Sequence, residues 1–382
     1  MTTYTFALLP GDGIGVEVVA QARRVLDAAA ELEGLEFRYD EIPCGAKYYL
    51  EHGADWPEGS RERCASADAI LLGAIGWPAE DGSGTTRRAD GRMAGWEAIV
   101  GNRAELELYA NIRPVKLLPG IQHMISGTHR NVWAPEDVDM VFVRENSEDL
   151  YAGIGGVRKI AGRQEVAIDT RIITRTATER IMVTAFDIAR RRAAVGRRRR
   201  VTCVVKDNVL LGCRLFVDVF HEIGQDYPEV EREVVLVDAF TQWLVRHPEK
   251  FDVVVAPNMF GDIITELASA LQGGIGMASG CNIGDRHGMF EPIHGSAPPI
   301  AGQNRANPMA TILAAAQALT WLSDKHSDPV LATAGGRIEA AVRSVVREGQ
   351  TLTYDLVGTE RASSTSEVTT AVIAALKADH AG

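Results

Sequence analysis

The chain has 382 residues, more than one hydrophobic core usually covers, so we expect two lobes. Its hydrophobic fraction of 46% is ordinary for a soluble globular protein, and no apolar run reaches the roughly 18 residues of a membrane helix. The formal net charge of −11 opposes nonspecific nucleic-acid binding, and the five cysteines lack the CxxC spacing of a zinc site or a disulfide framework. We therefore expect a cytoplasmic protein with reduced cysteines that binds neither membrane nor nucleic acid.

The N-terminal segment has the pattern of a strand at residues 4–9, a glycine-rich turn and a helix at residues 16–33. The glycines have G-x-G-x-G spacing rather than the G-x-G-x-x-G of a dinucleotide fingerprint, so a tight turn is the preferred interpretation. Further elements expected before residue 101 are strands at 37–42 and 69–72, a helix at 60–66, a loop at 82–95 and a helical turn at 96–100.

Three arginines follow, namely Arg103, Arg113 and Arg144, the last of which ends a predicted strand at residues 139–143. Guanidinium groups pair bidentately with carboxylates, so three of them in one pocket would suit a di- or tricarboxylic acid. A single arginine is more often a surface residue, and the interpretation depends on all three sharing one pocket.

Seven more arginines gather at residues 190–200, between a predicted amphipathic helix at 176–192 and a predicted strand at 200–206. Cations are favourable at a helix C-terminus, so a solvated helix end is preferred there over a nucleic-acid site.

An apolar run at residues 251–257 is followed by a helical pattern at 258–271, which predicts a buried parallel strand leading into a helix. Ligands gather at such strand ends. Asp262 and Glu266 lie four residues apart, so both carboxylates stand on one face of the helix and can hold a hard cation. The competing interpretation is that Asp262 caps the helix and Glu266 is a solvated charge.

Motifs along nearly the whole chain are LLPGDGIG (8–15), LYANIRPVK (108–116), VRENSEDLYAG (143–153), VVKDNVL (204–210), VDAF (237–240), NMFGDI (258–263) and EPIHGSAPPIAG (291–302). In this order they resemble the metal-dependent β-decarboxylating dehydrogenases of 2-hydroxy acids. That family contains isopropylmalate, isocitrate, homoisocitrate and tartrate/D-malate dehydrogenases.

The resemblance implies an α/β fold of two lobes that is isopropylmalate dehydrogenase-like and not a usual Rossmann fold. It implies that residues 1–108 and 273–382 form a first, cofactor-binding lobe. Residues 109–272 would then form a second lobe for dimerisation that carries metal and substrate residues. A homodimer with shared active sites is expected on the same basis.

The resemblance also implies roles. Tyr151 would be the acid that protonates the product carbon, and Lys206 of the partner subunit would help to remove the hydroxyl proton. The partner's Asp238 would join Asp262 and Glu266 around Mg²⁺ or Mn²⁺. From the residues alone, Lys206 also fits a solvated strand end and Asp238 a helix cap. The substrate residues implied are Trp96, Ile99, Val100, Arg103, Arg113, Arg144, Asn208 and Val209. The cofactor residues implied are Glu291, His294, Gly295, Ser296, Ala297, Pro299, Ile300 and Asn307.

The reaction explains these residue types. Hydride leaves C2 for a nicotinamide while a base takes the hydroxyl proton, and the 2-oxo acid then loses its 3-carboxylate as CO₂. A divalent cation on the C2 oxygen assists both steps as a Lewis acid. Carboxylate oxygens suit Mg²⁺ or Mn²⁺, whereas zinc would favour His or Cys.

Some positions depart from the family pattern. Glu266 stands where an aspartate is usual. Pro299 and Ile300 stand where NAD users carry an aspartate and NADP-dependent isocitrate enzymes carry Lys-Tyr. Tyr354 matches a tyrosine of NADP users, but Gly358 replaces their arginine. NAD is the expected cofactor, with NADP left open.

Two signals bear on the substrate and they conflict. Ile99, Val100 and Val209 resemble the apolar wall that isopropylmalate enzymes present to the isopropyl group, whereas Trp96 matches a tryptophan of tartrate/D-malate enzymes. 3-Isopropylmalate is the expected substrate, and D-malate or tartrate, isocitrate and homoisocitrate are the alternatives. A noncatalytic regulatory subunit on the same fold is the competing class; the retained Tyr151, Lys206, Asp238 and Asp262 favour the enzyme.

Overall fold

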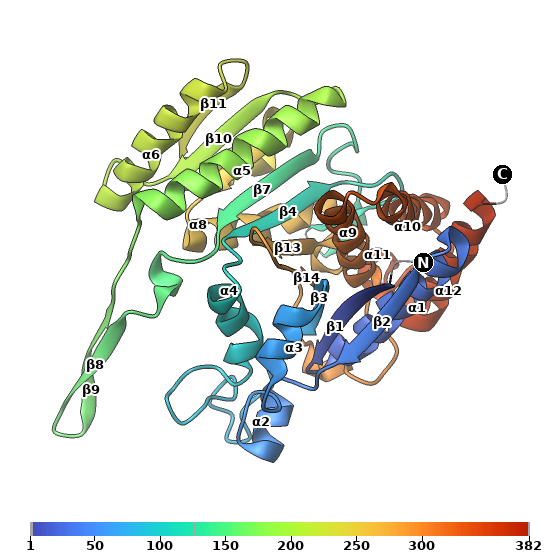
Figure 1. The fold of residues 1–382 in the computed structure, drawn as a ribbon, viewed down its shortest axis with the longest axis horizontal. Helices are drawn as coiled ribbons and strands as arrows, with labels where there is room; N and C mark the ends of the chain where they lie inside the picture. The colour runs from blue at the N-terminus through green and yellow to red at the C-terminus, as the bar shows by residue number, and fades with distance from the viewer. Residues whose placement is uncertain (1–2, 126, 381–382) are drawn as a thin grey trace. The chain divides into compact units, whose positions relative to one another are not determined.

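The computed structural model describes residues 3–125 and 127–380, which divide into two compact units. The first unit comprises Met1–Leu108, Leu117–Pro135 and Ser269–Gly382, and the second comprises Tyr109–Lys116 and Glu136–Ala268. Both units contain parallel strands flanked by helices, so the predicted α/β class is confirmed (Figure 1). Residues 117–135 and 269–272, which the sequence analysis assigned to the second lobe, cluster with the first unit. The roles assigned to the lobes stay predictions.

The strands of the first unit follow the order β13-β14-β3-β1-β2, in which only the β13–β14 pair is antiparallel. Its elements are β1 (Thr3–Gly11), α1 (Ile14–Glu33), β2 (Glu36–Glu41), α2 (Ala46–His52), α3 (Ser60–Ser66), β3 (Ala69–Ala74), the π-helix η1 (Glu97–Gly101), α4 (Asn102–Glu105), β5 (His123–Ile125), β6 (Thr128–Arg130), η5 (Ala270–Gln272), η6 (Ile275–Met277), β13 (Ser279–Ile283), β14 (Gly288–Pro292), η7 (Pro298–Ile300), α9 (Met309–His326), α10 (Pro329–Glu348), α11 (Tyr354–Val357), η8 (Thr359–Arg361) and α12 (Thr365–His380).

The strands of the second unit follow the order β11-β10-β12-β7-β4, in which only the β7–β4 pair is antiparallel. Its elements are β4 (Ala110–Lys116), β7 (Asp139–Glu145), η2 (Leu150–Ala152), β8 (Gly155–Ile160), β9 (Arg163–Asp169), α5 (Arg175–Ala194), β10 (Arg200–Val205), α6 (Leu211–Ile223), η3 (Gly224–Asp226), β11 (Glu231–Leu236), α7 (Val237–Arg246), η4 (Pro248–Lys250), β12 (Val253–Ala256) and α8 (Asn258–Ser269).

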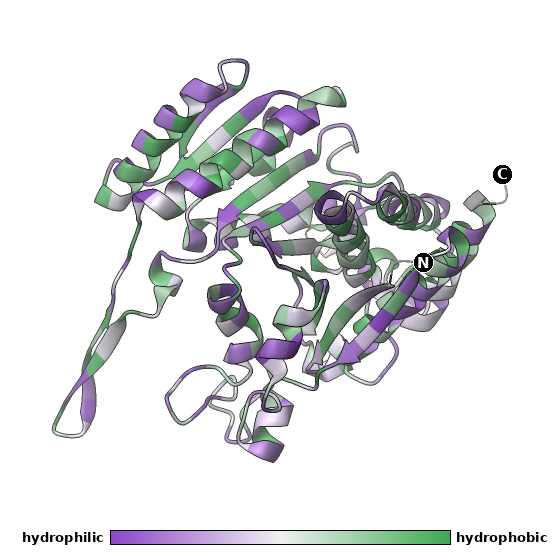
Figure 2. Cartoon of the chain, in the orientation of Figure 1, coloured by the Kyte–Doolittle hydropathy of each residue, from purple (hydrophilic) through white to green (hydrophobic). Residues whose placement is uncertain are grey.

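Strand β7 shows why the second unit has helices on both faces. Val141 and Val143 belong to the apolar cluster that includes residues of α5 and α6. Phe142 points the other way and meets Phe240 of α7 edge to face, with ring centroids 6.2 Å apart. Successive side chains of a strand alternate between its faces, so the apolar run at residues 140–143 of β7 needs cover on both sides. Figure 2 shows hydrophobic residues along these strands and mixed character on α5 and α6.

The predicted tight turn between β1 and α1 is confirmed. Gly13 has φ 57°, and a Cβ at this position would lie 2.0 Å from the carbonyl oxygen of Ser296. A side chain is therefore excluded by contact as well as by backbone conformation. The glycine lets the turn approach the segment that carries the predicted cofactor residues.

The hairpin β8–β9 was missed by the sequence analysis. In Figure 1 it extends as an arm from the second unit, and all residues of both strands are exposed. Alternating apolar and charged residues in this stretch carry no signal for what the arm contacts, because neither face is buried in one chain.

The arginine-rich segment, the cysteines and the helices bear on three further expectations. Ion pairs at residues 190–200 join Arg190 with Glu229, Arg192 with Asp252, Arg197 with Asp139 and Arg200 with Glu231. Arg190 and Arg197 are exposed as expected of a solvated helix end, whereas Arg192 is largely buried against Asp252. The five cysteines are all buried and free, as expected. Among the described residues, none of the helices combines the length and apolar character needed to cross a bilayer.

Candidate active site

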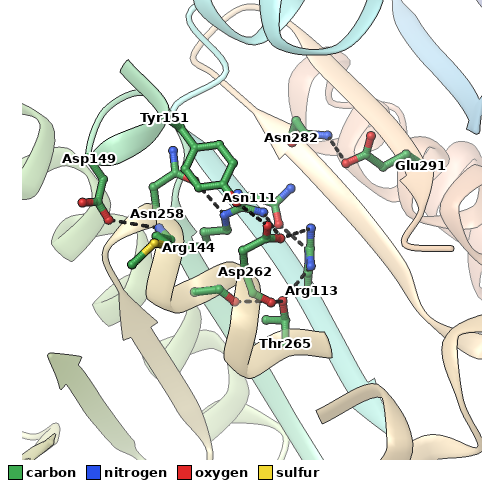
Figure 3. A network of polar contacts seen from close by, with 12 residues as sticks. Asn111, Arg113, Arg144, Asp149, Tyr151, Asn258, Asp262, Thr265, Asn282 and Glu291 are labelled. Carbon is green, nitrogen blue, oxygen red and sulfur yellow. Dashed lines mark hydrogen bonds and ion pairs between the residues drawn. The ribbon is translucent and has the colours of Figure 1, made fainter. Parts of the chain in front are cut away.

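Asp262 on α8 is the centre of a polar cluster in the second unit (Figure 3). Its Oδ1 accepts hydrogen bonds from Arg144 Nη1 at 2.5 Å and from Arg113 Nη2 at 3.4 Å. Its Oδ2 accepts the phenol hydrogen of Tyr151 at 2.8 Å. One carboxylate thus gathers two cations and one phenol, so three of the predicted site residues share this cluster with Asp262.

Both arginines are held rigidly. Arg144 is 2% exposed and donates from Nε to Asn258 Oδ1 at 2.9 Å. Arg113 is 5% exposed and donates from Nε to Asn111 Oδ1 at 2.7 Å and from Nη1 to Thr265 Oγ1 at 2.6 Å. Fixed guanidinium groups are preorganised for bidentate binding of a carboxylate. The sequence analysis missed the three residues that fix them.

Sheet register explains this convergence. The parallel pairing of β12 with β7 sets Ala256 beside Arg144, and α8 begins two residues after Ala256. The end of one strand and the start of a helix therefore meet at one sheet edge, as sequence reasoning expected. A Cβ at Gly261 would lie 2.8 Å from the Cβ of Arg144, so the glycine of the NMFGDI motif allows this close approach.

Glu266 lies one turn beyond Asp262 on α8, as the spacing predicted. Partial shielding from water raises the pKa of its carboxyl group, and the charge of Asp262 raises it further, against the lowering effect of Arg113 and Arg144. Burial is therefore the main factor that disfavours the ionised form of Glu266, and the two arginines favour that form.

Lys206 and Asp238 form a second polar group in the same unit. Register pairing of Val205 with Leu236 brings the ends of β10 and β11 together, and Lys206 Nζ donates to Asp238 Oδ2 at 2.9 Å. The hydrogen bond from Lys206 lowers the pKa of the exposed Asp238 carboxyl group. Among the described residues of one chain, no three His, Cys, Asp or Glu side chains gather as a metal site, so Asp238 does not join Asp262 and Glu266 within a protomer.

The first unit contains a cavity of about 600 Å³. Five predicted cofactor residues line it: His294, Gly295, Ala297, Ile300 and Asn307. Tyr354, which the sequence analysis compared with a tyrosine of NADP users, lines it as well. Its remaining lining, which the sequence analysis did not connect with the cofactor, is Ile14, Met124, Gly273, Gly274, Ile275, Gly276, Ala306 and Asp355. Ile14, Met124, Tyr354 and Asp355 are distant in sequence from the EPIHGSAPPIAG motif, so only the fold brings them to the cavity.

His294 has an unused polar atom at this cavity. The side chain is 7% exposed, and its Nδ1 lies 3.0 Å from the carbonyl oxygen of Gly295. Burial lowers the pKa of the imidazole, so the ring is neutral near pH 7 with its proton on Nδ1. The buried Nε2 has no hydrogen-bond partner among the described residues and is left as an acceptor.

The other predicted cofactor residues have contacts of their own in the first unit. Glu291 accepts from Arg103 Nη2 and from Asn282 Nδ2, both at 2.9 Å, so Arg103 is tied to a predicted cofactor residue. Ser296 donates its hydroxyl hydrogen to the carbonyl of Gly76. Pro299 accepts from Gln303 through its carbonyl oxygen.

The predicted substrate wall is divided between the units. Ile99 packs against an apolar cluster of the first unit, Val100 is half-buried, and the Trp96 ring lies 5.5 Å from the guanidinium of Arg92. Asn208 and Val209 are exposed in the turn after β10 of the second unit. That all of these residues share one pocket with the arginines stays a prediction.

Comparison with known proteins identifies the family of the chain. Residues 5–372 match the family model described as isocitrate/isopropylmalate dehydrogenase, and the chain belongs to this family of dehydrogenases. The predicted isopropylmalate dehydrogenase-like fold is confirmed by a solved isocitrate dehydrogenase from Methylococcus capsulatus, with a TM-score of 0.83, 34% identity and coverage of 98% of this chain and 99% of that one.

Two named relatives are similar to the chain over most of its length. A 3-isopropylmalate dehydrogenase of Thermobifida fusca (strain YX) is 41% identical over 350 residues, which are 91% of this chain and 92% of the relative. A probable tartrate dehydrogenase/decarboxylase of Bacillus subtilis (strain 168) is 38% identical over 382 residues, 99% of this chain and 99% of the relative. The resemblance inferred from the motifs is therefore confirmed at the level of the family.

Proposed function

We propose that the protein is an NAD- and divalent-metal-dependent dehydrogenase that oxidises and decarboxylates a 3-substituted malate, with 3-isopropylmalate as its first candidate substrate. The observation that carries the proposal is the convergence of Arg113, Arg144 and Tyr151 on Asp262. Two buried guanidinium groups, an acidic hydroxyl and a carboxylate are the groups that binding and protonating a dicarboxylic acid require.

The donor set of α8 fits Mg²⁺ or Mn²⁺. Asp262 and Glu266 offer only oxygen, one turn apart, and these ions bind well to one or two carboxylates completed by substrate and water. When bound, the ion supplies Lewis-acid polarisation of the substrate's C2 oxygen. Asp238 is proposed as the third carboxylate, contributed by the partner subunit.

The cavity of the first unit fits a nicotinamide cofactor. Its volume of about 600 Å³ lies within the range of cofactor and ligand sites. Ile14, Ile275, Ile300 and Ala306 give it apolar walls, and the unpaired Nε2 of His294 can accept a hydrogen bond from an amino group. When bound, NAD supplies the hydride acceptor.

Residues of the chain itself bind the substrate and transfer protons to and from it. Arg113 and Arg144 bind and orient the substrate's carboxylates. Lys206 of the partner subunit takes part in removing the hydroxyl proton, while the C2 hydrogen leaves as hydride. After the 3-carboxylate departs as CO₂, Tyr151 donates its phenol proton to C3. Tyr151 is 38% exposed, so water can return the proton to its Oη for the next cycle.

A homodimer with shared active sites is part of the proposal. Every residue of the β8–β9 arm is exposed, and a two-stranded hairpin has little stability by itself in water. Its exposed apolar side chains, together with the residue that precedes it, are Ile154, Val157, Ile160, Val166 and Ile168. A second copy of the chain that covers the arm would bury them, and isologous pairing is the commonest arrangement for such contacts.

D-malate or tartrate is the second candidate substrate. It is favoured by Trp96 and by the relative named as a probable tartrate dehydrogenase/decarboxylase, which this chain matches over nearly its whole length. The apolar Ile99 and Val100 favour the isopropyl group instead.

A substrate panel tests the proposal. We expect NADH formation from 3-isopropylmalate that depends on added Mn²⁺, with smaller rates from D-malate, tartrate, isocitrate and homoisocitrate, and with NAD preferred over NADP. A faster reaction with D-malate or tartrate would transfer the proposal to the second candidate. No turnover with any malate derivative would leave the noncatalytic subunit as the better account.

A further inference from the structure

Asp149 is a buried carboxylate with two partners on opposite sides. Its Oδ2 accepts the backbone N–H of Met259, the second residue of α8, at 3.0 Å. Its Oδ1 accepts from Nε of Arg171. A carboxylate that accepts one of the free N–H groups at a helix N-terminus stabilises that end of the helix, so Asp149 holds the start of α8, the helix that presents Asp262 (Figure 3).

The backbone of Asp149 is strained as well as anchored. It has φ 70° and ψ −143°, a region that residues with a side chain rarely adopt. A paired bridge with Ile172 holds it there, with the N–H of Asp149 donating to the carbonyl of Ile172 at 2.8 Å. The η2 turn with Tyr151 begins at the next residue. The same residue therefore sets the direction of the turn that carries the phenol.

Arg171 completes the unit. It lies two residues after the end of β9, at the base of the β8–β9 arm. Its Nη1 lies 3.2 Å from Sγ of Cys213 on α6, and its guanidinium carbon lies 4.9 Å from the ring centroid of Phe260 on α8. Arg171 thus contacts both Asp149 and the residue of α8 that follows Met259.

We propose that the buried Asp149–Arg171 ion pair is a positioning unit that ties the base of the β8–β9 arm to the two parts of the active site, the Tyr151 turn and the start of α8. Neither residue touches the reacting groups; both act through Tyr151 and Asp262. The inference rests on the proposed function for its effect on turnover, but its effect on local order does not depend on that function.

The test compares Arg171→Lys with Arg175→Met. Lysine keeps the charge but loses the planar fork that Asp149 and Phe260 contact. Arg175 is a control of the same residue type in the same unit, and its partner Glu222 is exposed. In Arg171→Lys we expect amide hydrogen exchange at residues 149–152 and 258–262 to rise about tenfold or more, and kcat to fall about tenfold with KM for NAD unchanged. Arg175→Met should change neither.

A double-mutant cycle separates positioning from general stability. If Arg171 acts through Tyr151, then Arg171→Lys should lower kcat by less than about threefold in a Tyr151→Phe background. If Arg171→Lys does not fold, the pair Asp149→Asn with Arg171→Met removes both charges and leaves no unpaired ion, while asparagine tolerates the positive φ. This pair should show the same faster exchange and lower kcat.

Wild-type exchange at both segments in either variant would overturn the inference. So would a fall in kcat that is equally large with and without the Tyr151 hydroxyl. If the wild-type protein turns over no substrate, the proposed function fails, and the exchange measurement alone still decides whether the ion pair orders the turn and the helix.

Discussion

Replacing Asp262 with asparagine should cost stability as well as activity. The substitution removes the charge that Arg113 and Arg144 share, and both arginines are almost completely buried. Hydrogen bonds to charged groups contribute about 1.5–3 kcal/mol each. The Asp262 side chain is 32% exposed, so solvent screens part of this, and we expect a net loss of about 2 kcal/mol. That loss corresponds to a fall of roughly 4–8 °C in the unfolding temperature of the second unit.

Asp238→Asn is the matched control, because it removes the same charge from a carboxylate whose side chain is 65% exposed and whose ion pair is with Lys206. Its unfolding midpoint should stay near that of the wild type. Both variants are to be compared by thermal and denaturant unfolding without metal, with fluorescence and circular dichroism recorded together, because two units can unfold separately. Equal midpoints for the two variants would show that Asp262 does not organise the buried arginines, and the description of the site would then be wrong.

Further predictions concern the chemistry. Tyr151→Phe should impair protonation after decarboxylation and Lys206→Met should stop the hydride step, each by roughly 10² to 10⁴ in rate; wild-type turnover would remove that residue from the mechanism. Mixing inactive Lys206→Met and Asp262→Asn protomers should restore partial activity, and exchanged heterodimers that stay inactive would refute shared sites. Glu266→Asp should stay active and Glu266→Gln should raise the Mn²⁺ midpoint, whereas an unchanged midpoint would exclude Glu266 as a ligand. The pKa of Glu266 is raised in the folded state, so its charged form destabilises the metal-free fold, and Glu266→Gln should raise the unfolding midpoint at pH 7. This gain should vanish as the pH falls below the ordinary glutamate pKa, where the carboxyl group is protonated in both states. A gain that persists at low pH would contradict the shift.

Much of the second-unit site could be predicted because its parts are local. The distance of four residues between Asp262 and Glu266 fixes their common helix face, and an apolar run that precedes a helix marks a strand end. The position of Asn111, two residues before Arg113 on the same strand, was also readable, since residues i and i+2 share a face. Asn258 and Thr265 became recognisable only once β7 and β12 were paired.

The lining of the cavity in the first unit could be predicted only in part: His294, Gly295, Ala297, Ile300 and Asn307 were expected from the resemblance. Met124 and Ile275 were not, because they come from separate segments and no periodicity links them. The hairpin arm was missed for a different reason: both of its faces are exposed in one chain, so its short alternation of apolar and polar residues does not mark a buried face. Asp149 was missed because a positive φ on a residue other than glycine is imposed by tertiary contacts and has no local signature.

The measurement that tests the central claim most directly is the stoichiometry of NADH and CO₂ formed from 3-isopropylmalate in the presence of Mn²⁺. Oxidation followed by loss of the 3-carboxylate requires one CO₂ for each NADH, and both products should disappear when the metal is chelated. In Tyr151→Phe the two products should fall together in steady-state turnover. NADH formation without CO₂, or undiminished formation of both after chelation, would contradict a metal-dependent oxidative decarboxylation.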